Sequence, residues 1–448
     1  MKKLITTFIT LLFIYLLSVT VHAYDPFKIS SDIKDFKPEI QADSGDIEQI
    51  LIDSFDCDPR IVLYYKGYSG SRNSSSSVIN INYDNTDVPI EDIYFAENTD
   101  ELISLITRAL LYSRDRICIT SCNLSSDIST VSQYISDISE TCPIAFTGYR
   151  GSSISALDTK LGGYSYFIID FEYDFDSETL NSMKRELERK ACEIIASNVA
   201  RDMPPYMKVF IIHNYIINNC RYASDYETNT DPSYYTAYGA LVKGKAVCDG
   251  YASAAKILFD LCGIENIKIS GTSKGSSHAW NLIKLGNDYY HIDTTWDDPV
   301  SSSGIDYLKY NYYNLTDSEI SIDHTWNTNE CPAAKGSTYT YEKTTELIEN
   351  DTNNYTEGYT SFDSVFGKYA PLTGSINPNI HLSGSEQTEN VSSKTIEPDS
   401  ILNETEDNLH ISSNTFSYII ARLLEDPMAS VEIIFVIVLI IAVVRRLF

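Results

Sequence analysis

The sequence predicts an α+β protein in which a core domain at residues 177–332 follows a smaller α+β domain at residues 24–176. Two patterns predict this class. Apolar residues recur every three or four positions through residues 177–220, which is typical of helices, and alternate with period two from residue 278, which is typical of strands. Helices followed by antiparallel strands within one segment indicate an α+β fold.

Length and composition agree with two or three folded units. The chain has 448 residues, of which 43% are hydrophobic, so it can bury at least one sizeable core. The same fraction excludes disorder over the whole chain. The formal net charge of -28 does not favour the basic face that binding to phosphates requires, so we expect no nucleic-acid partner.

The smaller domain contains two similar passages, residues 58–85 and 142–176. Each has a Gly-Tyr-x-Gly-Ser turn followed by an alternating run, and helix-like segments such as residues 101–113 lie before them. This pattern predicts a weak internal repeat. No catalytic cluster falls within the domain, so we expect it to position a substrate or partner, and simple packing support is an equally good interpretation.

Three helices are predicted in the core domain. Residues 177 onward carry Leu180, Met183 and Leu187 at helical spacing, and Pro204-Pro205 opens a second helix. A third helix is predicted over residues 249–262, and Gly263 marks its C-terminal end. His213 on the second helix is expected to be a core histidine.

The two ends predict the compartment. Residues 1–23 combine two lysines, an apolar stretch and a terminal alanine, which is typical of a cleaved signal peptide, with an uncleaved anchor as the alternative. Residues 427–448 contain the apolar run 433–444 followed by Arg445 and Arg446, which predicts a transmembrane anchor with a short cytoplasmic tail. The alternative for this run is a buried core helix.

These ends predict a cell-membrane protein with a single span and an extracellular ectodomain, residues 24–426. Within it, residues 333–426 are rich in Ser, Thr, Asn and Glu, which predicts a disordered polar stalk. The nine cysteines are an odd number, so at least one thiol is expected to be unpaired. The cysteines include no C-x-x-C pair, and no calcium-loop pattern occurs, so no metal and no cofactor are expected.

Cys248 is the first candidate catalytic residue. It follows a short strand-like piece and lies at the start of the third predicted helix. The positive end of the helix dipole and the unpaired N–H groups there stabilise a thiolate, which is the nucleophilic form of cysteine. The alternative is a buried or disulfide-bonded cysteine.

A predicted hairpin supplies two partners for Cys248. One strand begins at His278, turns at Gly286-Asn287, and returns to Asp293. With a two-residue turn, opposed residues have numbers that sum to 573, so His278 and Asp293 lie on one face as diagonal neighbours. An aspartate can then hold the imidazole while its other nitrogen takes the cysteine proton.

These residues resemble the transglutaminase-like superfamily, whose fold is similar to that of papain. The likeness rests on Cys248 followed by Gly-Tyr-Ala, on His278-Ala-Trp-Asn, and on Asp293-x-Thr-Trp-x-Asp-Pro. It is supported by the helix around residues 212–216 with Tyr222, and it covers about residues 177–332. The resemblance implies that Cys248 is the nucleophile, His278 the base and Asp293 the orienting residue.

The resemblance also implies oxyanion donors: the backbone N–H of Cys248 and an upstream side chain, for which Tyr238 is the candidate. Trp280 and Trp296 either line the cleft or pack in the core. His291 is expected on the His278 side of the hairpin, and Asp297 and Asp298 are expected to form a turn.

The sequence thus predicts a cysteine acyltransferase or hydrolase. A thioester would form on a peptide or glutamine-type amide of a substrate outside the cell, and water or an amine would resolve it, giving proteolysis, deamidation or cross-linking. The alternative is a non-enzymatic surface adhesin or scaffold that uses the fold as a binding module.

Overall fold

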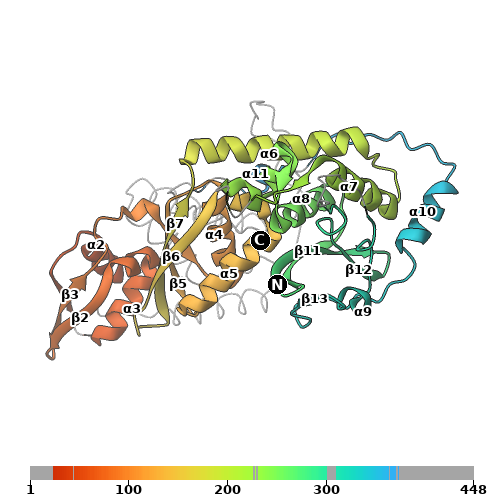
Figure 1. Cartoon of the computed structure of the whole chain (residues 1–448). Helices are drawn as coiled ribbons and strands as arrows, with labels where there is room; N and C mark the ends of the chain where they lie inside the picture. The colour runs from red at the N-terminus through yellow and green to blue at the C-terminus, as the bar shows by residue number, and fades with distance from the viewer. Residues whose placement is uncertain are drawn as a thin grey trace, which may run out of the picture. The chain divides into compact units, whose positions relative to one another are not determined.

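A computed structural model describes residues 24–43, 45–225, 228, 231–299, 309–362, 364–369 and 372 (Figure 1). The predicted α+β class is confirmed. The chain forms two compact units, and their boundary differs from the predicted one at residue 176. In the described part, the first unit comprises residues 24–61 and 66–83, and the second comprises residues 62–65 and everything from residue 84 onward.

The first unit is a small sheet with two helices. Its strands have the order β1-β3-β2, and β1 pairs antiparallel with β3. Asp25 and Asp46 cap the two helices by accepting hydrogen bonds from first-turn N–H groups, which explains where both helices begin. The elements are α2 (Pro26–Lys34), β1 (Glu39–Asp43), α3 (Ile47–Cys57), β2 (Tyr65–Arg72) and β3 (Ser76–Tyr83), with a 3-10 turn at Pro59–Tyr64 before β2.

The second unit begins with a four-stranded sheet of order β4-β5-β7-β6. Strands β4 and β5 are parallel, whereas β7 pairs antiparallel with both β5 and β6. Its elements are β4 (Ile93–Ala96), α4 (Thr99–Leu111), β5 (Arg116–Cys122), α5 (Ile128–Thr141), β6 (Tyr149–Asp158) and β7 (Tyr164–Tyr173), with 3-10 turns at Ile90–Asp92 and at η3, Pro143–Phe146.

The two similar sequence passages belong to sheets in which the strands are arranged alike. In each sheet a strand is followed by a helix, a 3-10 turn and two further strands, and the last strand lies between the other two. The orders β1-β3-β2 and β5-β7-β6 are therefore alike, although the second sheet has the additional strand β4. The internal repeat itself stays a prediction.

The remainder of the second unit is three helices and a second sheet. The helices are α6 (Ser177–Asn198), α7 (Pro205–Asn219) and α8 (Cys248–Leu261), each within a residue or two of its predicted range at the ends that were predicted. The strands β10 (Asn266–Ser273), β11 (Ser276–Leu285), β12 (Asp288–Ile292) and β13 (His324–Trp326) have the order β12-β11-β10-β13. Two short strands, β8 (Arg221–Tyr222) and β9 (Lys245–Ala246), pair in parallel before α8.

Helix α8 is the buried centre of this region. It packs against β10 and β11 on one side and against α6 and α7 on the other, and nearly all of its first three turns are buried. In Figure 1 the long helix α6 lies beside α8. Its Lys184 also reaches α4, where the ammonium group donates to the last carbonyls of that helix, Leu110 and Leu111.

The folded unit continues past residue 332, where the sequence predicted a stalk. The elements there are α9 (Asp317–Ile320), α10 (Tyr341–Glu349) and α11 (Val365–Lys368). Tyr341 of α10 stacks on Tyr310 with ring centroids 4.2 Å apart, and Thr344 is fully buried. Tyrosines embedded in a polar segment thus supply the apolar surface that attaches it to the core. The rest of the predicted stalk is almost entirely outside the described residues.

Among the described residues, no helix has the length and apolar character needed to cross a membrane. The predicted signal peptide (1–23) and the predicted anchor (427–448) lie outside them.

Candidate active site

Cys248 is the first residue of α8 and is half-buried. The preceding residue, Val247, offers no side chain to cap the helix. By contrast, a carboxylate or amide side chain caps the helices α3, α4, α5 and α6: Asp46, Asn98, Asp127 and Asp176. The first N–H groups of α8 therefore lack a side-chain cap where a bound anionic group could take its place.

The Gly-Tyr-Ala sequence after Cys248 fixes the position of helix α8. A Cβ atom on Gly250 would lie 2.7 Å from the Tyr234 carbonyl oxygen and 2.9 Å from that of Thr236, so only glycine fits. The buried hydroxyl of Tyr251 donates a hydrogen bond to Asp298. Asp298 therefore holds α8, which is more than the simple turn that the sequence predicted.

The hairpin has the predicted register. Asn281 pairs with Ile292 and Leu282 with His291, so paired residues sum to 573. Gly286 adopts a positive φ of 64° in the two-residue turn. Asn281 also donates from Nδ2 to the carbonyl of Ala252 at 3.1 Å, which ties β11 to α8. This bond gives the asparagine of the His-Ala-Trp-Asn sequence a positioning role.

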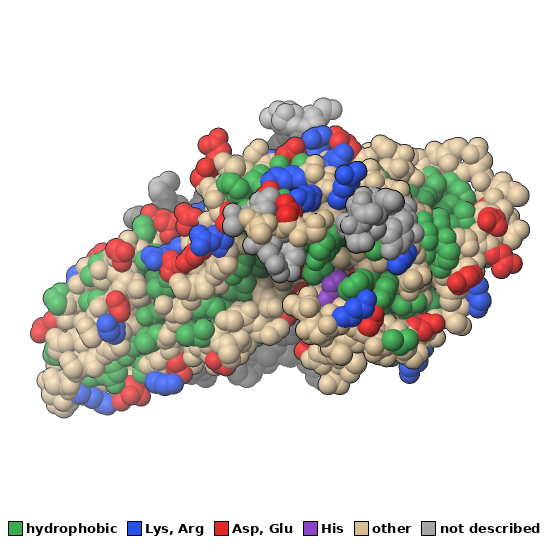
Figure 2. Space-filling view, viewed as in Figure 1, with side chains coloured by type: hydrophobic (Ala, Val, Ile, Leu, Met, Phe, Trp, Pro, Cys, Tyr) green, Lys and Arg blue, Asp and Glu red, His purple; other side chains and the backbone are tan. Residues whose placement is uncertain are grey.

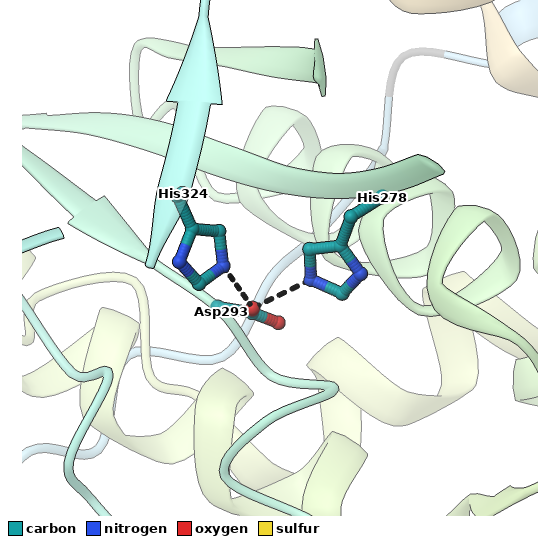
Figure 3. A group of neighbouring side chains, drawn as sticks. All are labelled: His278, Asp293 and His324. Atoms are coloured by element: carbon teal, nitrogen blue, oxygen red, sulfur yellow. Dashed lines mark hydrogen bonds and ion pairs between the residues drawn. The ribbon is translucent and has the colours of Figure 1, made fainter. Parts of the chain in front are cut away.

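Asp293 binds His278, as the register predicted. Its Oδ2 lies 2.7 Å from Nε2 of His278, and its Oδ1 accepts the backbone N–H groups of Thr295 and Trp296 at 2.9 and 3.1 Å. Figure 3 shows a second imidazole, that of His324, reaching the same oxygen, with Nε2 at 3.1 Å. Four hydrogen bonds thus hold one fully buried carboxylate.

These contacts shift the pKa values of both partners. Burial opposes the charged carboxylate, but the charge and hydrogen bond of His278, together with those of His324, outweigh it and lower the pKa of Asp293 to about 2. Burial also opposes protonation of His278, but Asp293 and a hydrogen bond with Cys248 raise its pKa from 6.5 to about 10. The buried pair is therefore an imidazolium and a carboxylate at neutral pH.

Cys248 raises the pKa of His278, so the start of α8 lies close enough to the hairpin for the two side chains to interact. Because Nε2 of His278 is taken by Asp293, Nδ1 is the ring nitrogen left for the sulfur. The structure therefore brings Cys248, His278 and Asp293 into one continuous chain of contacts. Such a chain can stabilise a thiolate and can pass a proton to or from a group attached at the sulfur.

Tyr238, the candidate for an oxyanion donor, is engaged elsewhere. Its hydroxyl donates to Glu186 of α6 at 2.7 Å, and Lys243 lies over its ring. None of the described contacts of Tyr238 reaches Cys248 or His278. Its role in binding an oxyanion stays a prediction without structural support.

The two tryptophans differ in burial. Trp280 is 1% exposed, packs in the core with Ile269 and Leu282, and donates from Nε1 to His291 at 3.0 Å. Trp296 is half-buried with its ring centroid 6.1 Å from that of His278, and Lys274 lies over its outer face at 3.5 Å. Trp280 is therefore a core residue beside the site, whereas Trp296 partly covers it.

Three further histidines are buried near the site. His291 lies on the His278 side of the hairpin, as predicted, and binds Asp317 at 3.0 Å. His213 is a core histidine, as predicted, but it binds Asp297 at 3.0 Å, a pairing that the sequence did not reveal. Asp297 also accepts the N–H of Tyr312, so its role is to hold the chain after the hairpin.

His324 is the site residue that the sequence prediction missed. It begins β13, which pairs antiparallel with β10. Gly271 permits this pairing, because a Cβ atom there would lie 2.2 Å from the Thr325 carbonyl oxygen. The signal in the sequence is that His324-Thr325-Trp326 repeats the His-x-Trp pattern of His278-Ala279-Trp280.

The donor atoms of His278, Asp293 and His324 lie within 4.8 Å of one another, a spacing that a metal ion could bridge. In the described structure these atoms are instead joined by hydrogen bonds. All nine cysteines, including Cys248, are free thiols in the structure.

A cavity of about 780 Å³ opens beside the start of α8, where Asp249 and Ser253 line it. Asp249 is the direct neighbour of Cys248, and Lys268 of β10 binds its carboxylate at 2.6 Å. The cavity is also lined by α5, η3 and β6 from the region of the β4-β5-β7-β6 sheet, including Ser136, Phe146 and Arg150. On the face drawn in Figure 2, a small histidine surface is visible within a hollow.

Comparison with known proteins agrees with the motifs. Residues 193–294 match the family described as the transglutaminase-like superfamily, which confirms the predicted resemblance for this segment. The match includes Cys248, His278 and Asp293 but ends before His324. No curated protein matches the sequence.

Solved structures with similarity to the chain include a TGase, a putative cysteine protease from Cytophaga hutchinsonii and Legionella pneumophila LapG. Their sequence identities are 14%, 15% and 11%, and their TM-scores are 0.23, 0.20 and 0.20. The aligned regions cover 50%, 33% and 39% of this chain and 63%, 65% and 87% of those chains. The chain thus spans less than two thirds of the first two.

Proposed function

We propose that the transglutaminase-like domain of this chain is a cysteine acyltransferase or hydrolase that acts on peptide or glutamine-type amides. Cys248 is the nucleophile, His278 the acid and base, and Asp293 the orienting residue. The observation that carries the proposal is the contact chain from the uncapped start of α8 through His278 to Asp293, with 2.7 Å between the last two.

The proposed reaction follows from these contacts. The thiolate of Cys248 attacks the amide carbonyl, and the N–H groups at the start of α8 receive the developing negative charge on oxygen. The C–N bond breaks as protonated His278 gives its proton to the departing nitrogen, leaving a thioester on Cys248. Water or an amine, deprotonated by His278, then attacks the thioester and releases the thiolate.

Mass spectrometry tests this function. The purified protein and its Cys248→Ala variant are incubated with mixtures of surface peptides, which are scored for cleavage, for loss of amide and for new isopeptide bonds. We expect at least one of these changes with the unaltered protein and none with the variant. Peptides that bind without Cys248-dependent change would support a binding module instead.

We further propose that the substrate lies in the cavity that α8 lines together with α5, η3 and β6. The cavity borders the neighbour of Cys248, and hydroxyl groups such as those of Ser136 and Ser253 offer hydrogen bonds to a peptide. This placement gives the region before α6 a part in positioning the substrate.

A bulky residue in this cavity is expected to weaken substrate binding. Ser136 is exposed on α5 and lines the cavity, so Ser136→Trp should raise KM by roughly tenfold or more while kcat changes little, the signature of lost uniform binding. Gln133→Trp, on the same helix but outside the cavity lining, is the matched control. Equal effects of both variants would place the substrate elsewhere.

The proposed location is the outer side of a cell membrane, with the predicted span at residues 427–448 as the tether. Protease added to intact cells should then digest residues 24–426 and leave a small membrane-bound fragment, which an antibody against the C-terminus would detect. A protein that stays intact until the cells are opened would contradict this topology.

A further inference from the structure

His324 has no part in the proposed reaction, yet it shares an oxygen with the triad. Its ring is 1% exposed and lies 5.3 Å from the ring of His278, measured between centroids. Both imidazoles point at Oδ2 of Asp293 from different strands, β11 and β13 (Figure 3). For a histidine buried at this position, the question is which of its ring nitrogens carry protons.

Both ring nitrogens of His324 face carboxylates. Nε2 lies 3.1 Å from Oδ2 of Asp293, and Nδ1 lies 2.6 Å from Oδ1 of Asp323. An ionised carboxylate accepts hydrogen bonds but donates none, so each nitrogen must supply a proton. Because the pKa values of both aspartates are lowered by their partners, both are ionised at neutral pH. Both ring nitrogens are therefore placed to donate to anionic carboxylates, an arrangement that favours the doubly protonated, positively charged form of the ring.

The surroundings of His324 support this charge. The other oxygen of Asp323 accepts the hydroxyl of Tyr312 at 2.6 Å, and Lys274 lies 3.7 Å away, so Asp323 is well compensated. Trp280 packs edge-on against His324 with ring centroids 4.9 Å apart. The other titratable groups near it are His278, which repels a positive charge when it is protonated, His291, whose pKa is lowered by burial, and Asp293, which attracts a positive charge.

We infer that His324 is a positioning residue whose lasting positive charge keeps Asp293 ionised while His278 cycles between its protonated and neutral forms. This inference rests on the proposed function and deepens it. When His278 gives its proton to the leaving nitrogen, Asp293 would otherwise be a fully buried carboxylate without a cation, a costly state that pulls the proton back. His324 supplies the counter-charge at that moment.

The inference predicts a specific change in proton affinity. A neutral residue at position 324 removes one of the two cations that share Asp293, so His278 should hold its proton more tightly. The alkaline limb of kcat/KM should then move above its expected position near pH 10. Proton donation becomes harder, so kcat should fall by roughly 10- to 100-fold, the size of effect seen when an outer-shell partner of a metal-binding histidine is removed. KM should stay within about twofold.

The test uses His324→Gln, whose amide can still donate to Asp293 but carries no charge. The matched control is His291→Gln, which alters an equally buried histidine on the same sheet face that binds Trp280 and Asp317 but not Asp293. A merely structural role for His324 predicts similar effects of both variants, scored by thermal unfolding. The inference predicts that only His324→Gln moves the alkaline limb.

Nitrogen-15 NMR of histidine-labelled protein provides a readout that needs no turnover. At pH 7 both ring nitrogens of His324 should give signals of protonated nitrogen, and the titration of His278 should shift to higher pH in His324→Gln. An unprotonated ring nitrogen in His324 overturns the inference even if the variant does not fold. Loss of the proposed function alone would appear differently, as intact titrations in a protein without Cys248-dependent chemistry.

Discussion

Replacement of Cys248 by alanine is expected to abolish acyl transfer and leave the fold unchanged. The side chain is half-buried at the first position of α8, so its removal leaves no large cavity. It is also the atom to which the acyl group would be attached, so no other residue can take over its part. The loss in kcat should be roughly 10⁶-fold, as when the nucleophile is removed from the triad of a serine protease.

Competitive labelling of the nine cysteines tests the nucleophilic character of Cys248 without a known substrate. Iodoacetamide is added in limiting amount at pH 7, and peptides are quantified by mass spectrometry. Cys248 should be alkylated first, because a protonated His278 and the start of α8 both stabilise its thiolate. Cys331, which is also half-buried but whose pKa is raised by burial and by nearby carboxylates, should be labelled slowly.

Two results would contradict the assignment. One is equal labelling of Cys248 and Cys331 in the folded protein. The other is full activity of Cys248→Ala in the peptide assay, with Cys331→Ala as the matched control. Either result would favour a binding module over an enzyme.

The hairpin illustrates what the sequence can predict. The two-residue turn at Gly286-Asn287 determines which residues face each other, so the shared face of His278 and Asp293 follows from counting alone. The start of α8 follows from local pattern in the same way. These features are local, because each depends on residues within about 15 positions along the chain.

The features that the sequence did not predict are non-local. Strand β13 has three residues and pairs with β10 some fifty positions earlier, and so short a strand has no periodicity of its own. The pairs His213–Asp297 and Tyr251–Asp298 likewise join segments that lie 84 and 47 positions apart. In residues 341–349, frequent polar residues masked the tyrosine that anchors α10.

Replacement of Asp293 by asparagine should keep the fold and remove most activity. Asparagine has nearly the same shape, and its carbonyl oxygen can still accept the two backbone N–H groups that now bind Oδ1. It cannot balance the charge of an imidazolium, and its amide N–H₂ competes with Nε2 of His278 for the donor role. We expect kcat to fall by roughly 10⁴-fold, as for the equivalent change in a serine protease triad.

The pH dependence of activity should also change in Asp293→Asn, and the pKa of His278 determines the direction of that change. Burial lowers the pKa of His278, but Asp293, with a smaller contribution from Cys248, raises it from 6.5 to about 10. The unaltered protein should therefore keep protonated His278, and its activity, up to an alkaline limb near pH 10. Without the carboxylate, burial, which lowers the pKa and is the largest influence on it, is opposed only by Cys248, so the limb should move well below pH 10. Initial rates of the peptide reaction between pH 5 and 11 would measure it.

Asp297→Asn is the matched control. Asp297 is as deeply buried, lies four positions away and also binds a histidine, but it makes no contact with His278. Any general effect of replacing a buried aspartate should therefore appear in both variants, whereas the shift of the limb should appear only in Asp293→Asn.

The variants Asp293→Asn and His324→Gln are therefore expected to shift the alkaline limb in opposite directions. Removing the carboxylate lowers the alkaline limb, because His278 loses its anion, whereas neutralising His324 raises it, because Asp293 is left with His278 as its only cation. A general loosening of the site would move both limbs in the same direction. Opposite shifts are therefore the result that only a charge-coupled His278–Asp293–His324 arrangement produces, and a limb that stays near pH 10 in Asp293→Asn would show that this carboxylate does not control His278.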